Sequence, residues 1–169
     1  TRSKHMNNVQ QQIVDSLRER FGGSVEEVRE FRDDVIVVVD RAVIVDVATW
    51  LRDNETCPFP LCEDVFGIDA WTRKQRFEVN YHFFSLACKQ RIHLKVRVEE
   101  NDPSVPSITG VYPGAGWYER ETFDMYGILF PGHRDLRRSY MPEDFEYHPL
   151  RKDYPLMGIP GALPLPKRG

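Results

Sequence analysis

The spacing of apolar side chains predicts a helix at the start of the chain. In residues 8–21 these side chains recur three or four positions apart, which is the period of one helical face, at Val9, Ile13, Leu17 and Phe21, with Val14 beside them. A pair of glycines at positions 22–23 follows, and we expect it to end this helix.

The next stretch predicts two strands and one further helix. Residues 25–40, "VEEVREFRDDVIVVVD", indicate two strands that meet at a turn-like pair, Asp33 and Asp34. Residues 41–53 fit one helical face, although "VIVDV" has the composition of a strand. We interpret them as a helix, because Asp40 can cap its start and the polar sequence "RDN" ends it.

Residues 61–70, 76–86 and 91–98 predict three more strands separated by short breaks. Apolar and polar residues alternate most clearly in the third run, where Ile92, Leu94, Val96 and Val98 lie on one face and His93, Lys95 and Arg97 on the other. Because the breaks are short, we expect antiparallel hairpins.

The last helical region is expected from residue 107 to residue 126, with an interruption at Pro113 and Gly114. The predicted order of elements is therefore α-β-β-α-β-β-β-α. Strands grouped in this way favour an α+β fold, here an α/β two-layer sandwich in which helices cover one face of a mixed sheet of about five strands. We expect this domain to span residues 8–130.

The two ends of the chain differ from this domain in composition. Residues 131–169 contain seven of the twelve prolines, and their apolar residues occur singly, without a period. Single anchors favour a tail that lies extended along another surface over a disordered one; they are Phe145, Tyr147, Leu150, Tyr154 and Leu156. Residues 1–7 are interpreted as a disordered tag remnant around a native start at Met6.

Composition argues against several classes of protein. The chain is 41% hydrophobic and 12% aromatic, which favours a packed core. Its net charge of −3 argues against nucleic-acid binding. No apolar run approaches the roughly 20 residues that span a bilayer, and the polar start predicts no signal peptide. The three cysteines lack the close spacing of metal or iron–sulfur sites, so we expect reduced thiols at Cys57, Cys62 and Cys88.

Residues 119–138, "ERETFDMYGILFPGHRDLRR", mix charged and apolar side chains more evenly than a surface helix does. On a helix, one side would carry Tyr118, Thr122, Met125 and Tyr126, and the other Trp117, Arg120, Phe123 and Asp124, with Glu119 and Glu121 between. We therefore expect this helix to be covered on more than one face. Arg120 and Asp124 could pair within it, and other partners for buried charges are His133, Asp135, Arg137 and Arg138.

Three interpretations of these charges stay open: a self-paired cluster that ties the tail to the domain, contacts with a partner chain, or a catalytic centre. Acid–base or metal chemistry could come from Glu119, Glu121, His133, Asp135 and His148. However, the sequence has no HExxH motif, no phosphate-binding glycine loop and no nucleophile elbow, so we find no cofactor site. His82 and His93 occur singly on predicted strands, where we expect a structural role.

The same stretch resembles a known family signature. "ERETFDMYGILFPGHRDLRR" followed by "FEYHPLRKDYPL" is similar to the signature of the 30-kDa, C-type subunit of respiratory complex I, the NADH:quinone oxidoreductase. The upstream runs "RFEVNYHFFSL", "RIHLKVRVEENDPSVPSIT" and "WYERE" are similar too. The resemblance assigns to the signature and subunit interface Glu119, Arg120, Glu121, Asp124, Gly132, His133, Asp135, Arg137, Arg138, His148, Pro149, Leu150, Arg151, Lys152, Asp153 and Tyr154.

The resemblance implies a non-catalytic structural and assembly subunit. Chains of this family sit in the peripheral arm of the proton-translocating enzyme, on the cytoplasmic side of the bacterial inner membrane. They brace the 49-kDa, D-type subunit, beside subunits of the B, I and G types, and the tail runs along the 49-kDa partner. No catalytic, cofactor or metal site is then expected in this chain, since FMN, iron–sulfur clusters and quinone would belong to other subunits.

Other hosts and other functions remain as alternatives. An equivalent subunit of a membrane-bound hydrogenase, or of a photosynthetic or archaeal complex-I-like enzyme, would share these residues. A free-standing metal-dependent enzyme would use His133, Asp135 and His148 and would retain its metal. A binding domain with a disordered tail would stay monomeric beside every candidate partner.

Overall fold

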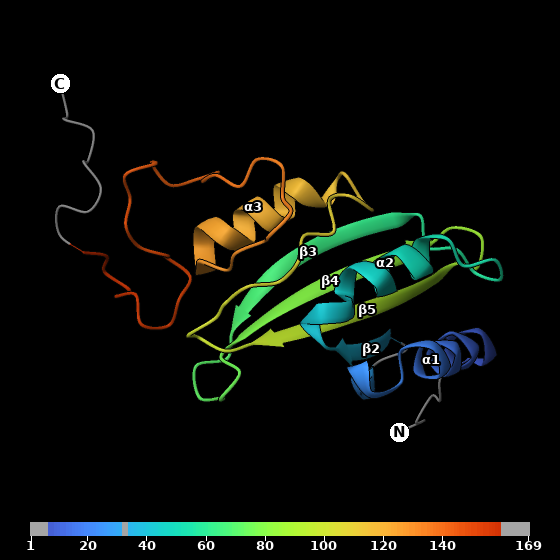
Figure 1. The fold of residues 1–169 in the computed structure, drawn as a ribbon. Helices are drawn as coiled ribbons and strands as arrows, with labels where there is room; N and C mark the ends of the chain where they lie inside the picture. Colours follow the sequence, from blue (N-terminus) through green and yellow to red (C-terminus); the bar gives the residue numbers. More distant parts are fainter. Residues whose placement is uncertain (1–6, 32–33, 160–169) are drawn as a thin grey trace.

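The order of helices and strands follows the predicted one in the computed structural model, which describes residues 7–31 and 34–159 (Figure 1). The elements are α1 (Asn8–Phe21), β1 (Val25–Phe31), β2 (Asp34–Val39), α2 (Ile44–Arg52), β3 (Leu61–Asp69), β4 (Phe77–Ser85), β5 (Gln90–Val98) and α3 (Ala115–Tyr126). Two short 3₁₀ helices, η1 (Gly22–Ser24) and η2 (Arg41–Val43), precede β1 and α2. Residues 1–6 of the predicted tag remnant lie outside the described residues.

The five strands form one mixed sheet in the order β1-β2-β5-β4-β3. β2 and β5 run parallel, and each other neighbouring pair is antiparallel. The short breaks after β3 and β4 allow direct hairpins, whereas a parallel pair needs the long connection that α2, β3 and β4 supply. The predicted α+β class with a mixed sheet is therefore confirmed. Of the predicted turn, Asp34 already belongs to β2, and Asp33 lies outside the described residues.

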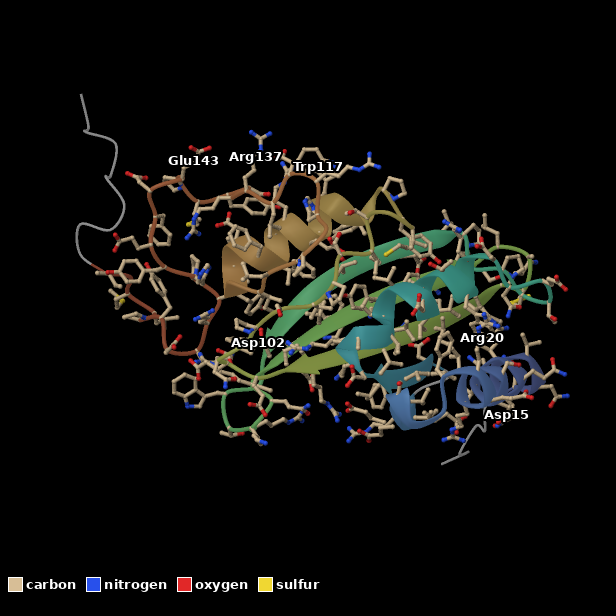
Figure 2. The ribbon with its side chains drawn as sticks, viewed as in Figure 1. Asp15, Arg20, Asp102, Trp117, Arg137 and Glu143 are labelled. Carbon is tan, nitrogen blue, oxygen red and sulfur yellow. A yellow bond between two sulfur atoms is a disulfide. The ribbon has the colours of Figure 1, made fainter. Side chains whose placement is uncertain are left out.

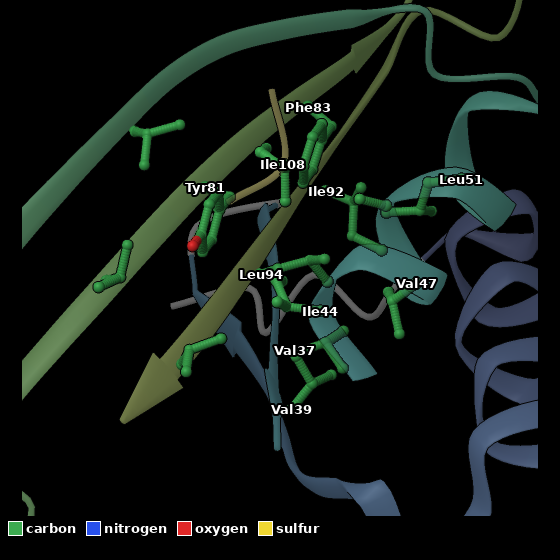
Figure 3. Close-up of a cluster of buried hydrophobic side chains, with 14 of the residues drawn as sticks. Val37, Val39, Ile44, Val47, Leu51, Tyr81, Phe83, Ile92, Leu94 and Ile108 are labelled. Carbon is green, nitrogen blue, oxygen red and sulfur yellow. The ribbon is translucent and has the colours of Figure 1, made fainter. Parts of the chain in front are cut away.

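One face of the sheet carries the hydrophobic core and all three helices. Helix α1 contributes Ile13, Val14 and Leu17 to this core. Figure 3 shows side chains of β2, β4 and β5 meeting those of α2, namely Val37, Val39, Tyr81, Phe83, Ile92 and Leu94 against Ile44, Val47 and Leu51. Helix α3 packs against β3 on the same side. Burial of this layer removes apolar area from water, which is the main favourable term in folding.

The other face of the sheet carries polar side chains, and none of the described helices packs on it. His93, Lys95 and Arg97 of β5 lie on this face, as their alternation predicts. Lys95 pairs with the buried Glu78 at 2.7 Å. His82 and His93 do not stand singly: cross-strand pairing stacks their rings with centroids 3.9 Å apart. Sequence spacing alone did not reveal this contact.

Helix ends follow the expected chemistry. Asn7 caps α1 by accepting the backbone N–H of Gln10 at 2.9 Å, and Gly22 ends the helix with a φ of +45°. The helix interpretation of residues 41–53 is confirmed by α2, which η2 precedes. Asp40 accepts the N–H of Ala42 at 2.7 Å and so caps η2, whereas α2 itself has no side-chain cap. None of the described helices is long and apolar enough to cross a membrane.

The helix expected from residue 107 begins only at Ala115, so that part of the prediction is wrong. The preceding loop uses its backbone donors elsewhere: Val105 donates to the carbonyl of Leu129 at 2.9 Å, and Ser107 to that of Pro131 at 2.8 Å. These bonds join the loop before α3 to the segment after it, and a helix starting at residue 107 would forgo them.

The prediction of three reduced thiols is wrong for two cysteines. The structure joins Cys57 and Cys88 in a disulfide, with Cα atoms 5.8 Å apart. These residues lie 31 positions apart in sequence, but the loop after α2 and the turn between β4 and β5 meet at one end of the sheet. Cys62 is free, and burial raises the pKa of its thiol to about 12.

Candidate functional site

Two glycines fix the placement of α3, which carries the first signature residues. Gly127 ends the helix with a φ of +72°, and its N–H donates to the carbonyl of Phe123 at 2.8 Å. On β3, Gly67 gives the helix room, because a Cβ at this position would lie 2.6 Å from the ring of Tyr126. The helix therefore lies directly against β3 (Figure 1).

Glu119 is fully buried and holds the preceding loop to α3. Its carboxyl accepts the hydroxyl of Ser107 at 2.6 Å and the backbone N–H of Ile108 at 2.8 Å. Burial raises the pKa of Glu119 to about 7, although both hydrogen bonds favour the ionised form. The helical wheel placed Glu119 between two faces, but the loop that covers it makes it one of the most buried residues of the helix.

Asp124 is also fully buried, and the segment after α3 winds around its carboxylate. This group accepts a hydrogen bond from the Nη1 of Arg138 at 2.6 Å. It also accepts hydrogen bonds from the backbone N–H groups of Ser139, Tyr140 and Met141, at 2.9, 2.7 and 3.0 Å. Burial opposes ionisation, but these four donors outweigh it and lower the pKa of Asp124. The expectation that α3 is covered on more than one face is confirmed here.

Arg120 does not pair with Asp124, so that prediction is wrong. Its Nη2 donates to Asp135 at 2.9 Å, and the same carboxylate forms an ion pair with the Nε of Arg137 at 3.1 Å. The intrahelical pair is replaced because Asp124 already has four donors from residues 138–141. The sequence left three interpretations of these charges open. The contacts in the structure match the first, a cluster of charges that pair with one another and tie the tail to the domain.

The proposed metal ligands His133, Asp135 and His148 are not brought together. His133 donates from Nε2 to the carbonyl of Gly116 at 3.0 Å and accepts the Asp135 N–H on Nδ1 at 3.0 Å. His148 donates from Nδ1 to the carbonyl of Asp124 at 2.9 Å. Within residues 7–31 and 34–159, no three His, Cys, Asp or Glu side chains are arranged to hold a metal ion. Both imidazoles therefore form hydrogen bonds with backbone groups of this chain.

The second part of the family signature, residues 145–156, which we call the second signature block, packs over the C-terminal end of α3. Arg151 donates from Nε to the carbonyl of Tyr126 at 2.6 Å. The ring of His148 and the guanidinium of Arg151 approach Gly127 so closely that a Cβ there would lie 2.5 and 2.6 Å from them. Gly127 is therefore required both for its backbone conformation and for this contact.

A buried ion-pair cluster also holds the second signature block to the domain, and the sequence did not predict it. Arg76 is buried, and its guanidinium pairs with Asp69 at 2.7 Å, with Asp153 at 3.1 Å and also with Glu100. Asp69 also accepts the backbone N–H of Lys152 at 2.8 Å. The signal that could have found it was the position of Asp69 and Arg76, opposite charges at the two ends of a predicted hairpin turn.

The remaining signature positions lie mostly at the surface. Gly132 forms a turn with a φ of +91°. The ring of Tyr154 meets that of Phe145 edge to face and that of Tyr147 at a tilt, with centroids 6.3 and 6.0 Å apart. Exposed or half-buried side chains occupy the other positions, which are Glu121, Pro149, Leu150, Lys152 and Asp153.

The coil after α3 leaves large apolar side chains in contact with solvent. Residues 131–159 contain no helix or strand, yet the contacts above hold them to α3. Of the twelve exposed large hydrophobic side chains in the described part of the chain, seven belong to α3 or follow it. We call these seven the α3–tail surface; they are Trp117, Leu129, Tyr140, Tyr147, Leu150, Leu156 and Met157. Single exposed apolar residues are common, but because most of them fall in this one segment, it is the candidate interaction surface of the described chain.

Comparison with known proteins gives a consistent family. Residues 37–160 match the family described as "Respiratory-chain NADH dehydrogenase, 30 Kd subunit", and this range includes both signature blocks. The C-type subunit of NADH-quinone oxidoreductase from Roseiflexus sp. (strain RS-1) is 50% identical over 144 residues, which cover 85% of this chain and 83% of that protein. The corresponding subunit of Methylobacterium sp. (strain 4-46) is 47% identical over 159 residues, 94% and 74% of the two chains.

Two solved structures share the fold. The trypsin-resistant fragment of Nqo5 aligns with a TM-score of 0.62 and 26% identity, over 75% of this chain and 98% of that chain. A chain of the membrane-bound sulfane sulfur reductase, an archaeal respiratory membrane complex, aligns with a TM-score of 0.72 and 23% identity, over 87% and 86%.

Proposed function

Because the chain belongs to the 30-kDa subunit family of respiratory-chain NADH dehydrogenase, we propose that it is a structural subunit of a complex-I-type enzyme. In this role it braces the 49-kDa, D-type subunit in the peripheral arm and performs no electron-transfer step of its own. FMN, iron–sulfur clusters and quinone would be bound by other subunits. Its position would be on the cytoplasmic side of the bacterial inner membrane, beside subunits of the B, I and G types.

The observation that carries this proposal is that the charged residues of the signature bind other parts of the same chain. Asp124 and Arg138 fix the path of the coil after α3, and Glu119 fixes the loop before it. Their bonds form within this chain, so the coil has a defined shape before any partner arrives. A preorganised surface binds with less loss of conformational entropy than a segment that must first be ordered.

The same contacts favour a scaffold over a reactive centre. A catalytic histidine needs a free nitrogen directed at a substrate, but His133 uses both nitrogens within the fold. His148 donates to a backbone carbonyl at the end of α3. These imidazoles support the shape of the α3–tail surface, and elemental analysis of the purified chain would expose a retained metal if the free-standing enzyme were correct.

Among possible hosts, sequence identity favours NADH:quinone oxidoreductase. The two bacterial relatives from that enzyme are 47–50% identical to this chain over most of its length. The archaeal reductase chain shares only 23% identity, so its likeness concerns the fold alone. An equivalent place in a hydrogenase or other complex-I-like enzyme remains the second proposal.

Co-purification with a 49-kDa-type protein tests the proposal. The chain is expressed beside that protein as wild type, as the double variant Tyr140→Ser/Leu150→Ser, and as Leu86→Ser. Leu86 is a matched control, because it is 61% exposed in the turn between β4 and β5, away from the α3–tail surface.

We expect wild type and Leu86→Ser to co-elute with the 49-kDa-type protein on a sizing column, and the double variant to separate from it. If the wild-type chain elutes alone, or if the double variant binds as well as wild type, docking through the α3–tail surface is refuted.

A further inference from the structure

The outer side of α3 contains a small cavity beside the contact of Arg120 with Asp135. It has a volume of about 230 Å³, and the loop before α3, the first turns of α3 and residues 133–135 line it. Pockets for free small molecules usually measure roughly 300–1,000 Å³. The smaller size of this cavity favours a single inserted side chain.

The charges around this cavity are unbalanced. Arg120 and Arg137 share one carboxylate, that of Asp135, at 2.9 and 3.1 Å. Arg134 also lines the cavity, is exposed, and makes no ion pair or hydrogen bond with the described part of the chain. Two guanidinium groups, those of Arg120 and Arg134, therefore line the cavity beside one carboxylate, and Arg137 adds positive charge next to Asp135 from outside the lining.

The guanidinium of Arg120 is also incompletely satisfied. Its Nε is buried and has no hydrogen-bond partner among the described residues. The group stacks over the ring of Trp117 at 4.9 Å, and that ring is itself 70% exposed. Figure 2 shows Trp117 and Arg137 on the outer side of α3. An exposed aromatic ring beside one unpaired arginine and one that lacks an acceptor for its Nε is typical of a protein interface core.

We propose that this cavity receives an Asp or Glu side chain of the partner subunit that the α3–tail surface binds. Its carboxylate pairs with Arg134 and compensates the positive charge, while its methylene groups pack on the ring of Trp117. Arginine suits this task because its planar group binds a carboxylate through two parallel hydrogen bonds. The inference rests on the proposed function, and it adds the chemistry of the docked residue.

Charge reversal at a residue without structural contacts tests this assignment. Arg134→Glu inverts the cavity charge without breaking a described contact, and Arg18→Glu makes the same change in net charge on the exposed side of α1. The dissociation constant for a 49-kDa-type protein is measured by calorimetry at low and high salt, and the melting temperature of each free variant is checked. We expect Arg134→Glu to weaken binding by about tenfold or more at low salt, and Arg18→Glu to leave it unchanged.

The outcomes separate the two proposals. If wild type does not bind the 49-kDa-type protein, the proposed function fails together with this inference. If wild type and Arg134→Glu bind equally well, or if both variants weaken binding to the same extent, the cavity does not hold a partner carboxylate, although the proposed function stands. A further variant, Trp117→Ala, should weaken binding at both salt concentrations, because it removes an apolar contact.

Discussion

The carboxylate of Asp124 and the guanidinium of Arg138 lie 2.6 Å apart in a site where Asp124 is fully buried. This pair joins the last helix of the domain to the coil that follows it. Three backbone N–H groups after Arg138 complete the site. The path of residues 138–141, and with it the α3–tail surface, therefore depends on one buried charge.

Removal of Arg138 should destabilise the protein strongly. Arg138→Ala leaves the Asp124 carboxylate with its three amide donors but without a counter-charge, at an expected cost of about 3 kcal/mol in the free energy of unfolding. Arg137→Ala is the matched control, because that exposed arginine has a surface ion pair worth about 0–1 kcal/mol. Urea denaturation measures both, and equal small losses would contradict the account of Asp124.

Gly127 should tolerate alanine far less well than Gly158. Both have a similar positive φ, +72° and +74°, which an alanine adopts at a cost of about 1 kcal/mol. Only at Gly127 would the added Cβ clash with His148 and Arg151, at 2.5 and 2.6 Å, whereas the nearest atom to a Cβ at Gly158 is the hydroxyl of Tyr154 at 3.7 Å.

We therefore expect Gly127→Ala to lower the melting temperature more than Gly158→Ala, and to speed amide exchange in residues 148–154. Equal melting temperatures, with unchanged exchange, would show that the second signature block does not close over the end of α3.

The burial of Glu119 predicts a pH dependence of stability. Its pKa is about 7 in the folded protein, against an ordinary value of 4.5. Between these values the folded state binds more protons than the unfolded state, so the free energy of unfolding falls as pH rises from 4.5 to about 7. Glu119→Gln should remove this component, and the exposed Glu121→Gln should keep it. Unfolding curves across this interval would contradict the assignment if Glu119→Gln left the pH slope unchanged.

The stacked histidines on the open sheet face should act in the opposite direction. Burial lowers the pKa of both His82 and His93 below 6.5, and for His93 the charge of His82 lowers it further. Near the pair, Asp34 and Glu63 partly oppose these shifts, as does Asp64 for His82, whereas Arg91 adds to them. The unfolded state then binds more protons, so this pair costs stability as pH falls through 6.5.

NMR titration of the imidazole carbons measures these values directly. His82→Asn should raise the pKa of His93 toward its ordinary value, because the neighbouring charge is lost while the burial largely remains. A pKa of His93 at or above 6.5 in the wild-type protein would contradict the stacked, half-buried arrangement.

Local spacing was sufficient to predict most of the fold. Helix α1 and strand β5 have clean periods, since each presents one apolar face to a single core. The start of α3 was predicted eight residues too early, at residue 107 instead of Ala115, because the donors of the preceding loop are satisfied by residues 129–131, which no local pattern reveals.

The candidate site was located by sequence, but its contacts were not. The charge pattern and the family signature indicated the right segment, and the absence of a polar helix face predicted that a second layer covers it. Which charges pair depends on the path of the coil. Asp124 forms its ion pair with Arg138 and not with Arg120. Asp69 forms an ion pair with Arg76 and accepts the backbone N–H of Lys152. The disulfide of Cys57 and Cys88 and the stack of His82 and His93 likewise arise from strand pairing.

Hydrogen–deuterium exchange of the chain alone and bound to a 49-kDa-type protein tests the central claim most directly. The account predicts that binding protects α3 and residues 129–151, and leaves the open sheet face of β4 and β5 as it is in the free chain. Protection confined to β4 and β5, with α3 and the following coil unchanged, would contradict it and would place the partner on the opposite side of the sheet.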